Sequence, residues 1–163
     1  MLKIGLVMGS DSDLPALLPA IELMRKLEIP CEVRVISAHR TPEQARDFSA
    51  NAVHNGFGAI ICAAGKAAHL AGAMAANTTL PVIGIPIKSS TLDGLDALLS
   101  TVQMPQGMPV ATVAIDGAYN AALLAAQIIA LTDEKLADRL VKLRSEQTQS
   151  VIEKDKLVRA KYN

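Results

Sequence analysis

The sequence predicts a three-layer α/β/α domain, in which helices cover both faces of a parallel β-sheet. Short apolar runs alternate with amphipathic segments, at about thirty residues for each strand and helix. The apolar runs do not alternate with polar residues, as expected for strands that are buried on both faces. Alternating strands and helices call for right-handed crossovers between parallel strands. We therefore expect a doubly wound sheet with a flavodoxin-like strand order.

Five strands and five helices make up the predicted core. A proline in the first turn, Pro15, marks the start of the first helix. Thr41 is the expected N-cap of the second helix, with Pro42 at its first position and Gln44 at the capping-box position. The strands are expected at 2–8, 31–36, 58–63, 80–85 and 110–115. The helices are expected at 14–27, 42–54, 67–76, 92–102 and 120–131.

The C-terminal segment 133–161 differs from the rest of the chain, because it reads as one long, charged helix. Its apolar stripe is sparse and consists of Leu136, Leu140, Leu143, Val151 and Val158. A stripe this thin does not hold a helix in place alone, so the helix docks either on its own domain or on another subunit. We expect one domain over 1–163, with an α/β core at 1–131 and a helical extension at 132–163.

Composition excludes several classes of function. Sixteen basic and sixteen acidic residues cancel, which leaves no net field to attract nucleic acid or an anionic membrane. Two Phe, two Tyr and no Trp argue against modules that stack nucleobases. Cys31 and Cys62 lie in apolar runs without metal-binding neighbours, as expected for reduced, buried thiols. No leader and no membrane-length apolar run is apparent, so we expect a soluble, cytoplasmic protein.

Polar residues gather in the loops that should follow the strands. In a doubly wound sheet these loops form one crevice, where ligands bind. Ser10 and its neighbours offer hydroxyls and amides at a helix start, and Arg40 can hold phosphate through paired donors. Asp13 would accept hydrogen bonds from sugar hydroxyls. The loops that should meet are 9–13, 37–41, 64–69, 86–90 and the turn near 116–117.

His39 is the candidate acid–base group, since it follows a strand end between Ser37 and Arg40. Imidazole titrates near neutral pH, which suits a group that moves protons. His69 lies in the third loop among small residues, while His54, late on a helix, receives no role. The alternatives are a structural histidine and a capped turn that binds nothing. The chain has no Walker A motif, no GxGxxG, no nucleophile elbow and no metal-ligand cluster, so we expect neither a metal nor a nucleotide cofactor.

Six segments of the sequence resemble the PurE family, the catalytic subunit of phosphoribosylaminoimidazole carboxylase. They occur in the same order as in that family and span about residues 4–130. The first two read Met-Gly-Ser-Asp-Ser-Asp and Ser-Ala-His-Arg-Thr-Pro. The matching segments are 8–13, 37–42, 67–70, 80–84, 102–105 and 120–127.

The resemblance implies a mutase that converts N5-carboxyaminoimidazole ribonucleotide into 4-carboxyaminoimidazole ribonucleotide, in de novo purine biosynthesis. In that family the carboxylate leaves N5 as trapped carbon dioxide and is recaptured at C4, while the histidine that matches His39 carries the proton. The family needs no metal and commonly forms octamers, which implies a homo-octamer here. The positions that match the ribose phosphate site are Ser10, Asp13, Ser37 and Arg40. Those around the migrating carboxylate are Gly65, Lys66, His69 and Leu70.

Two departures from the family pattern keep alternatives open. Lys66 replaces the second glycine of the usual Gly-Gly-Ala-Ala-His-Leu loop, and the turn at 115–119 is short. A second branch of the family carboxylates aminoimidazole ribonucleotide directly and carries Arg where this chain has Lys66. That branch lacks the histidine that matches His69 and has Lys at the position of Arg40. The alternatives are thus a direct carboxylase and a non-catalytic ribonucleotide-binding module.

Overall fold

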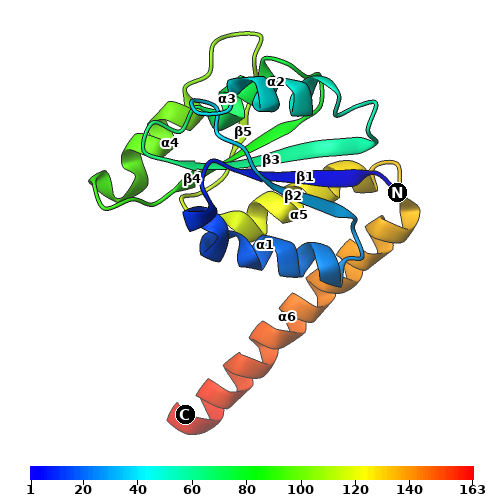
Figure 1. Ribbon diagram of the computed structural model, residues 1–163. Helices are drawn as coiled ribbons and strands as arrows, with labels where there is room; N and C mark the ends of the chain where they lie inside the picture. Colours follow the sequence, from blue (N-terminus) through cyan, green and yellow to red (C-terminus); the bar gives the residue numbers. More distant parts are fainter.

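A parallel five-stranded sheet forms the centre of the computed structural model, which describes residues 1–163. The strand order is β2-β1-β3-β4-β5, and every pair is parallel (Figure 1). This is the flavodoxin-like order, in which ligands bind beyond the carboxyl ends of the strands. The predicted fold class is confirmed. The strands are β1 Lys3–Met8, β2 Cys31–Val35, β3 Phe57–Gly65, β4 Val82–Ile87 and β5 Ala111–Thr112.

Helices cover the two faces of the sheet (Figure 1). One face carries α1 Leu14–Lys26 and α5 Ala118–Ala130, and the long helix α6 Glu134–Tyr162 adds to that layer. The other face carries α2 Pro42–Ala50, α3 Leu70–Ala75 and α4 Leu95–Val102. Two short 3-10 turns, η1 Asp11–Asp13 and η2 Leu92–Gly94, precede α1 and α4.

Side chains of the central strands alternate between two cores. Leu6 and Met8 pack toward α1 and α5, whereas Val7 packs toward α2 and α3. Gly5 has no side chain where the ring of Phe48 approaches, and a Cβ there would lie 3.0 Å from Phe48 Cζ. This close approach lets α2 pack directly on the sheet, and the packing fixes the position of the loop that leads into α2.

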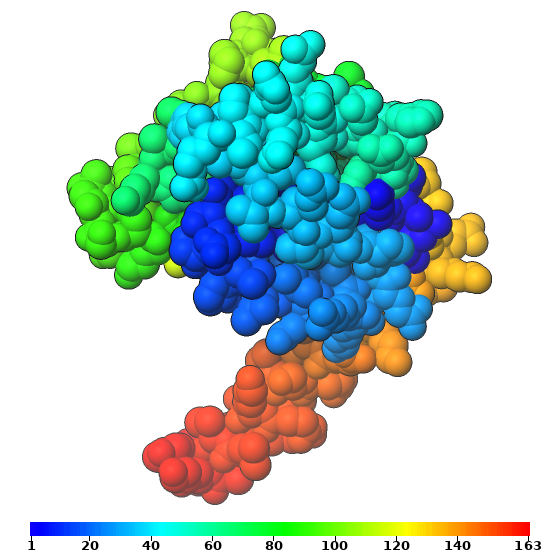
Figure 2. All heavy atoms as spheres, viewed as in Figure 1, coloured from blue at the N-terminus to red at the C-terminus, as the bar shows by residue number.

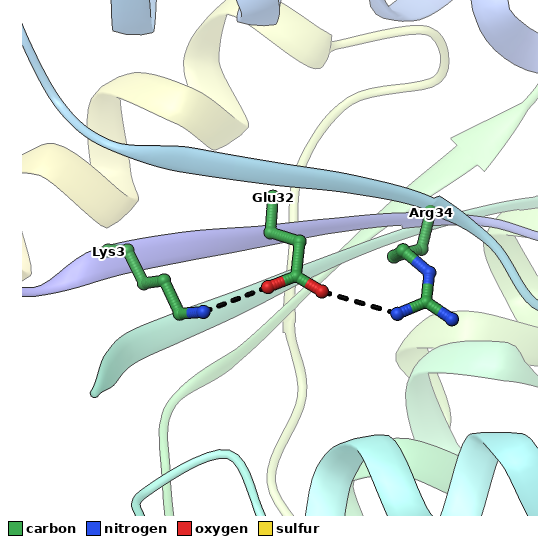
Figure 3. Close-up of polar contacts among 3 residues, drawn as sticks. All are labelled: Lys3, Glu32 and Arg34. Atoms are coloured by element: carbon green, nitrogen blue, oxygen red, sulfur yellow. Dashed lines mark hydrogen bonds and ion pairs between the residues drawn. The ribbon is translucent and has the colours of Figure 1, made fainter. Parts of the chain in front are cut away.

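The outermost strand β2 corrects the expectation that every strand is covered on both faces. Val35 at its end is 53 % exposed. Glu32 accepts hydrogen bonds from Lys3 Nζ at 2.8 Å and from Arg34 Nη1 at 3.2 Å (Figure 3). These ion pairs place charge along the free edge, which discourages pairing with another strand. Lys3 and Glu32 lie toward the strand starts, whereas Arg34 is the next-to-last residue of β2 and pairs with Val7.

Several element boundaries differ from the predictions for local reasons. The predicted 67–76 helix begins only at Leu70, because Lys66 is left-handed with φ of 55° and the chain turns first. The predicted capping box at Thr41 is wrong, since its hydroxyl donates back to Ser37 O at 3.1 Å. The helix expected at 42–54 ends at Ala50 and continues as turns.

The last two strands also depart from the predicted ranges. The strand expected at 110–115 is only two residues long, because it pairs with β4 at Ala111 and Thr112 alone. In contrast, β4 continues through Pro86 to Ile87, beyond the predicted end at residue 85. The helix predicted at 92–102 starts with η2, where Asp93 has φ of 52°.

Helix α6 has two halves that behave differently. Asp133 caps its start by accepting from the Leu136 amide at 3.0 Å. Leu136 and Leu143 are buried, and Glu146 accepts a hydrogen bond from Lys26 Nζ at 2.7 Å. Every residue from 144 to 163 is exposed, and the part beyond Gln147 projects away from the domain (Figures 1 and 2). Docking on the chain's own domain is therefore confirmed for the first half only.

The cysteines are free, and Cys62 is buried while Cys31 is half-buried. Burial raises the pKa of the Cys31 thiol to about 11, and it raises the pKa of Cys62 as well. Both thiols are therefore protonated at neutral pH and poorly reactive. None of the helices combines the length and the apolar character that crossing a bilayer requires.

Candidate functional site

A cavity of about 640 Å³ opens at the carboxyl edge of the sheet. Loops that follow β1, β2, β3 and β4 line it, as the strand order requires. The structure brings together every individual site residue that the sequence analysis named, whereas the turn near 116–117, also expected in the crevice, does not line the cavity. The named residues are Ser10, Asp13, Ser37, His39, Arg40, Gly65, Lys66, His69 and Leu70.

The loop after β2 holds Arg40 in a fixed arrangement. Arg40 Nη2 donates to Gly9 O at 3.0 Å, and its backbone amide donates to Ser37 Oγ at 3.2 Å. Ser37 is held in turn, because its amide donates to Thr41 Oγ1 at 2.9 Å. Arg40 therefore ties the β2 loop to the β1 loop, and the remaining guanidinium donors are available for a ligand oxyanion.

The loop after β1 is a small hydroxyl-rich turn. Ser12 donates to Ser10 Oγ from its hydroxyl at 2.9 Å and from its amide at 3.3 Å. Burial raises the pKa of the Asp13 carboxyl, and the charges of Asp11 and Asp116 act in the same direction. The hydrogen bond from Ser12 opposes this shift. Asp13 is the only carboxylate side chain among the residues that line the cavity.

His39 and His69 meet across the cavity. His39 Nε2 lies 2.8 Å from His69 Nδ1, and the two rings are nearly perpendicular at 83°. One of these nitrogens donates and the other accepts, so the contact couples the tautomers of the two rings. His39 comes from the loop after β2 and His69 from the loop after β3. The imidazole pair thus joins the loops after β2 and β3, which flank β1 in the sheet.

The loop after β3 provides the opposite wall. A Cβ on Gly65 would lie 3.3 Å from Ile87 O, so the two strands approach closely there. Lys66 follows in the left-handed region and is exposed. Leu70 is buried as the first residue of α3, and it anchors the loop that carries His69.

Three polar residues that line the cavity were missed as individual site residues: Ser12, Lys88 and Ser89. The loop 86–90 was expected in the crevice, but nothing in the sequence singled out a side chain there. Lys88 could have been found from the strand register. Gly65 and Ile87 form the last pair between β3 and β4, and a lysine directly follows each of them. The backbone of Lys88 is fixed, since its amide donates to Asp116 Oδ1 at 2.9 Å.

The cavity is positive although the whole chain is neutral. Arg40, Lys66 and Lys88 line it, against the one carboxylate of Asp13. Such a concentration of like charge attracts anionic ligands. No group of three or more His, Cys, Asp or Glu side chains is placed to hold a metal ion. The geometry therefore suits a small polyanion beside an imidazole pair.

Comparison with known proteins agrees with this chemistry. The family model described as AIR carboxylase matches residues 3–150. The chain belongs to the AIR carboxylase family. Within this family it is 52% identical over 146 residues to the N5-carboxyaminoimidazole ribonucleotide mutase of Pyrococcus abyssi, covering 90% of this chain and 84% of that protein. The mutase of the same name from Thermotoga maritima is 47% identical, over 94% of this chain and 90% of that one.

A second kind of relative carries a different name. The chloroplastic phosphoribosylaminoimidazole carboxylase of Vigna aconitifolia is 49% identical, over 94% of this chain but only 28% of that protein. The chain thus spans about a quarter of the plant protein. Among solved structures, PurE from Treponema denticola superposes with a TM-score of 0.83 at 28% identity, over 94% of this chain and 96% of that one. The chain is an enzyme of this family.

Proposed function

We propose that this chain is a mutase that converts N5-carboxyaminoimidazole ribonucleotide into 4-carboxyaminoimidazole ribonucleotide in purine biosynthesis. The observation that carries the proposal is the contact between His39 and His69 above a cavity lined by Arg40 and Ser37. The mutases named above support the same reaction. Such a reaction needs an anion site and a proton carrier, and it rearranges one substrate without a second.

The conversion is an isomerisation, so its atoms and charges balance within one molecule. The bond between N5 and the carboxylate carbon breaks, the electron pair stays on nitrogen, and carbon dioxide is released. C4 then attacks that carbon dioxide and forms the new carbon–carbon bond. The proton on C4 is lost and nitrogen gains one. A single carrier that first gives its proton to nitrogen and then takes up the proton lost from C4 ends the cycle in the state in which it began.

Each predicted residue has a role in this proposal. His39 carries the proton, and His69 orients its ring through the 2.8 Å contact. Ser10, Ser37 and Arg40 bind the phosphate, while Asp13 accepts hydrogen bonds from the ribose hydroxyls. Gly65, Lys66 and Leu70 with their loop surround the migrating carboxylate. No cofactor takes part in this scheme.

A direct carboxylase is the second candidate, and Lys66 is the observation that favours it. The carboxylase of Vigna aconitifolia adds a relative with that name. His69 and Arg40 favour the mutase, because the resemblance places neither in the branch that carboxylates directly. A non-catalytic binding module has no support at this level of identity to enzymes.

The deciding experiment offers both imidazole ribonucleotides to purified protein in parallel. We expect N5-carboxyaminoimidazole ribonucleotide to be converted without ATP or bicarbonate, well above a protein-free blank. Product is followed by the absorbance of 4-carboxyaminoimidazole ribonucleotide. Turnover of aminoimidazole ribonucleotide alone, and only at high carbon dioxide, would instead assign the direct carboxylase. Calorimetric binding without any product would assign a binding module.

We also propose that the enzyme assembles as a homo-octamer and that the projecting half of α6 takes part. Its exposed apolar residues include Val151, Val158 and Tyr162, which are 66%, 57% and 71% exposed in the single chain. Truncation after Gln147 keeps Leu136 and Leu143 docked on their own domain. Sedimentation velocity should therefore show a folded species of lower mass than the full chain. An unchanged sedimentation profile would exclude this half of α6 from assembly.

A further inference from the structure

Two lysines stand side by side at one end of the cavity. In the ladder between β3 and β4, Gly65 is paired with Ile87, and Lys66 and Lys88 directly follow this pair. Neighbouring strands lie about 5 Å apart, so the two backbones diverge from adjacent positions. Both lysines line the same cavity. Two ammonium groups on backbones this close can both approach one anion, which would offset the repulsion between them.

Neither lysine has a strong partner of its own. Lys66 belongs to none of the ion pairs in the structure. Lys88 Nζ lies 3.3 Å from Asp93 Oδ1, but the two side chains are 58% and 83% exposed. Ion pairs this exposed contribute little and exchange easily with water or with another anion. Both ammonium groups are therefore available to a ligand.

The backbones behind these lysines are held firmly. The Lys88 amide donates to Asp116 Oδ1 at 2.9 Å, and the Asp116 amide donates to Pro86 O at 2.9 Å. Lys66 O accepts a hydrogen bond from Ser100 Oγ at 3.3 Å. A ligand would thus have to order two side chains and no loop, which limits the entropic cost of binding.

The lysine pair and Arg40 lie at opposite ends of the cavity. Arg40 follows β2, whereas the lysines follow β3 and β4, and β1 separates them. From β2 to β3 the strand spacing adds up to about 10 Å. A ligand that reaches both ends therefore carries one anion at each end, separated by a neutral middle. A ribonucleotide with a carboxylate on its imidazole has this pattern.

We propose that Lys66 and Lys88 form a two-cation clamp for the carboxylate of the substrate and product, and that this clamp selects carboxylated ribonucleotides over aminoimidazole ribonucleotide. The proposal rests on the proposed function and adds to it the residue Lys88 and a basis for selectivity. Arg40 binds the phosphate that all three ribonucleotides share. The lysines bind the carboxylate, which distinguishes the two carboxylated ribonucleotides from aminoimidazole ribonucleotide.

Calorimetry with two ligands separates these roles. The dissociation constants of 4-carboxyaminoimidazole ribonucleotide and aminoimidazole ribonucleotide are measured for wild type, Lys66→Met and Lys88→Met. Methionine keeps the side-chain length and, at position 66, the same backbone strain. Each change should weaken binding of the carboxylated ligand about tenfold, as expected for one lost charge-assisted hydrogen bond. Binding of aminoimidazole ribonucleotide should change less than about twofold.

Two further variants test the assignment. Arg40→Met should weaken the binding of both ligands by the same factor, because both carry the phosphate. Lys88→Arg keeps the charge and should keep the preference for the carboxylated ligand. Thermal denaturation confirms that each variant is folded before its binding is measured.

The possible failures can be told apart. If the lysine variants weaken both ligands equally, or neither, the clamp is wrong while the mutase assay can still succeed. If wild type converts N5-carboxyaminoimidazole ribonucleotide but binds the two test ligands equally well, selectivity lies elsewhere and the clamp is wrong. If wild type binds neither ribonucleotide, the proposed function fails and the clamp fails with it.

Discussion

The two ends of the cavity are built in different ways. At the end near β2, Arg40 is bonded to Gly9 O and to Ser37, and Ser37 is bonded to Thr41. At the end near β4, Lys66 has a strained backbone and no ion pair, and Lys88 contacts only the exposed Asp93. One end is preformed, while the other holds exposed cations on a fixed backbone.

This difference matches the chemistry that we propose. A phosphate stays in place throughout the reaction, so a preformed site binds it without a new ordering cost at each step. The carboxylate leaves one atom and joins another, so its partners must follow it. Flexible ammonium groups can do so, whereas a guanidinium locked between two loops cannot. The pair of His39 and His69 lies between these ends.

The largest expected effect comes from removing the imidazole of His39, the proposed proton carrier between the two ends. His39→Asn should lower kcat by about a hundredfold to ten-thousandfold, the usual contribution of general acid–base catalysis. Binding of 4-carboxyaminoimidazole ribonucleotide should stay within about threefold, because both anion sites remain intact. Steady-state assays and calorimetry measure the two quantities.

The matched control is His54→Asn, which changes an exposed histidine outside the cavity. It should leave both kcat and binding unchanged. If His39→Asn kept near-normal turnover, His39 would not carry the proton. If it lost binding and turnover together, the histidine pair would belong to one of the anion sites.

The next effect separates the two ends by their stability without ligand. Arg40→Met removes the hydrogen bonds to Gly9 O and Ser37 Oγ and should lower the free energy of unfolding by about 1 kcal/mol. Lys88→Met removes only an exposed ion pair and should change it by less than about 0.5 kcal/mol. Urea denaturation measures both. Equal losses would show that the end near β2 is no more preformed than the other.

The overall fold could be predicted because apolar periodicity fixes strands, helices and their parallel pairing. Local turns could not, because they depend on partners far away in the chain. Asp116 turns the chain with φ of 56° and accepts a hydrogen bond from the Lys88 amide, and the last strand is only Ala111–Thr112. Thr41 turns its hydroxyl to Ser37, so the expected cap is absent. Tertiary contacts decided these details.

The candidate site could be predicted for a similar reason. A parallel sheet collects the loops after its strands at one edge, so residues far apart such as Ser10, His39 and His69 share one cavity. Lys88 was missed because its place beside Lys66 follows from the strand register. The predicted strand ended at residue 85, but the structure continues β4 to Ile87, which brings Lys88 to that edge.

A smaller effect of opposite sign should come from Lys66→Gly. Lys66 has φ of 55°, a conformation that costs an ordinary residue about 1–2 kcal/mol. Glycine avoids this cost but gains flexibility in the unfolded chain, so the net gain in the free energy of unfolding should be about 0.5 kcal/mol. Urea denaturation measures this variant and Lys66→Met, which keeps the strained backbone. The difference between the two isolates the contribution of the backbone to the free energy of unfolding. A loss of stability in Lys66→Gly would show that the lysine end is not strained.

The smallest effect tests the one carboxylate in the cavity through its dependence on pH. Burial raises the pKa of Asp13 above its ordinary value of 3.8, so the native state holds this proton more tightly than the unfolded chain does. The free energy of unfolding therefore falls as pH rises through the native pKa of Asp13. At neutral pH the full cost of burying the ionised carboxylate is present. Asp13→Asn cannot ionise and should be more stable than wild type at pH 7, by about a few tenths of a kcal/mol after solvent screening.

The difference between Asp13→Asn and wild type should shrink as pH falls and disappear below 3.8, where Asp13 is protonated in both the native and the unfolded state. Urea denaturation at several pH values measures it, and Asp138→Asn serves as a control on the docked part of α6, away from the cavity. A difference that stays constant with pH would mean that a lost contact, and not burial of the charge, sets the stability. In that case Asp13 would belong with the preformed end of the cavity, beside Ser37 and Arg40. If the stability difference shrinks as expected, burial of the charge destabilises the free protein. A ligand that donates hydrogen bonds to the Asp13 carboxylate would then offset that cost.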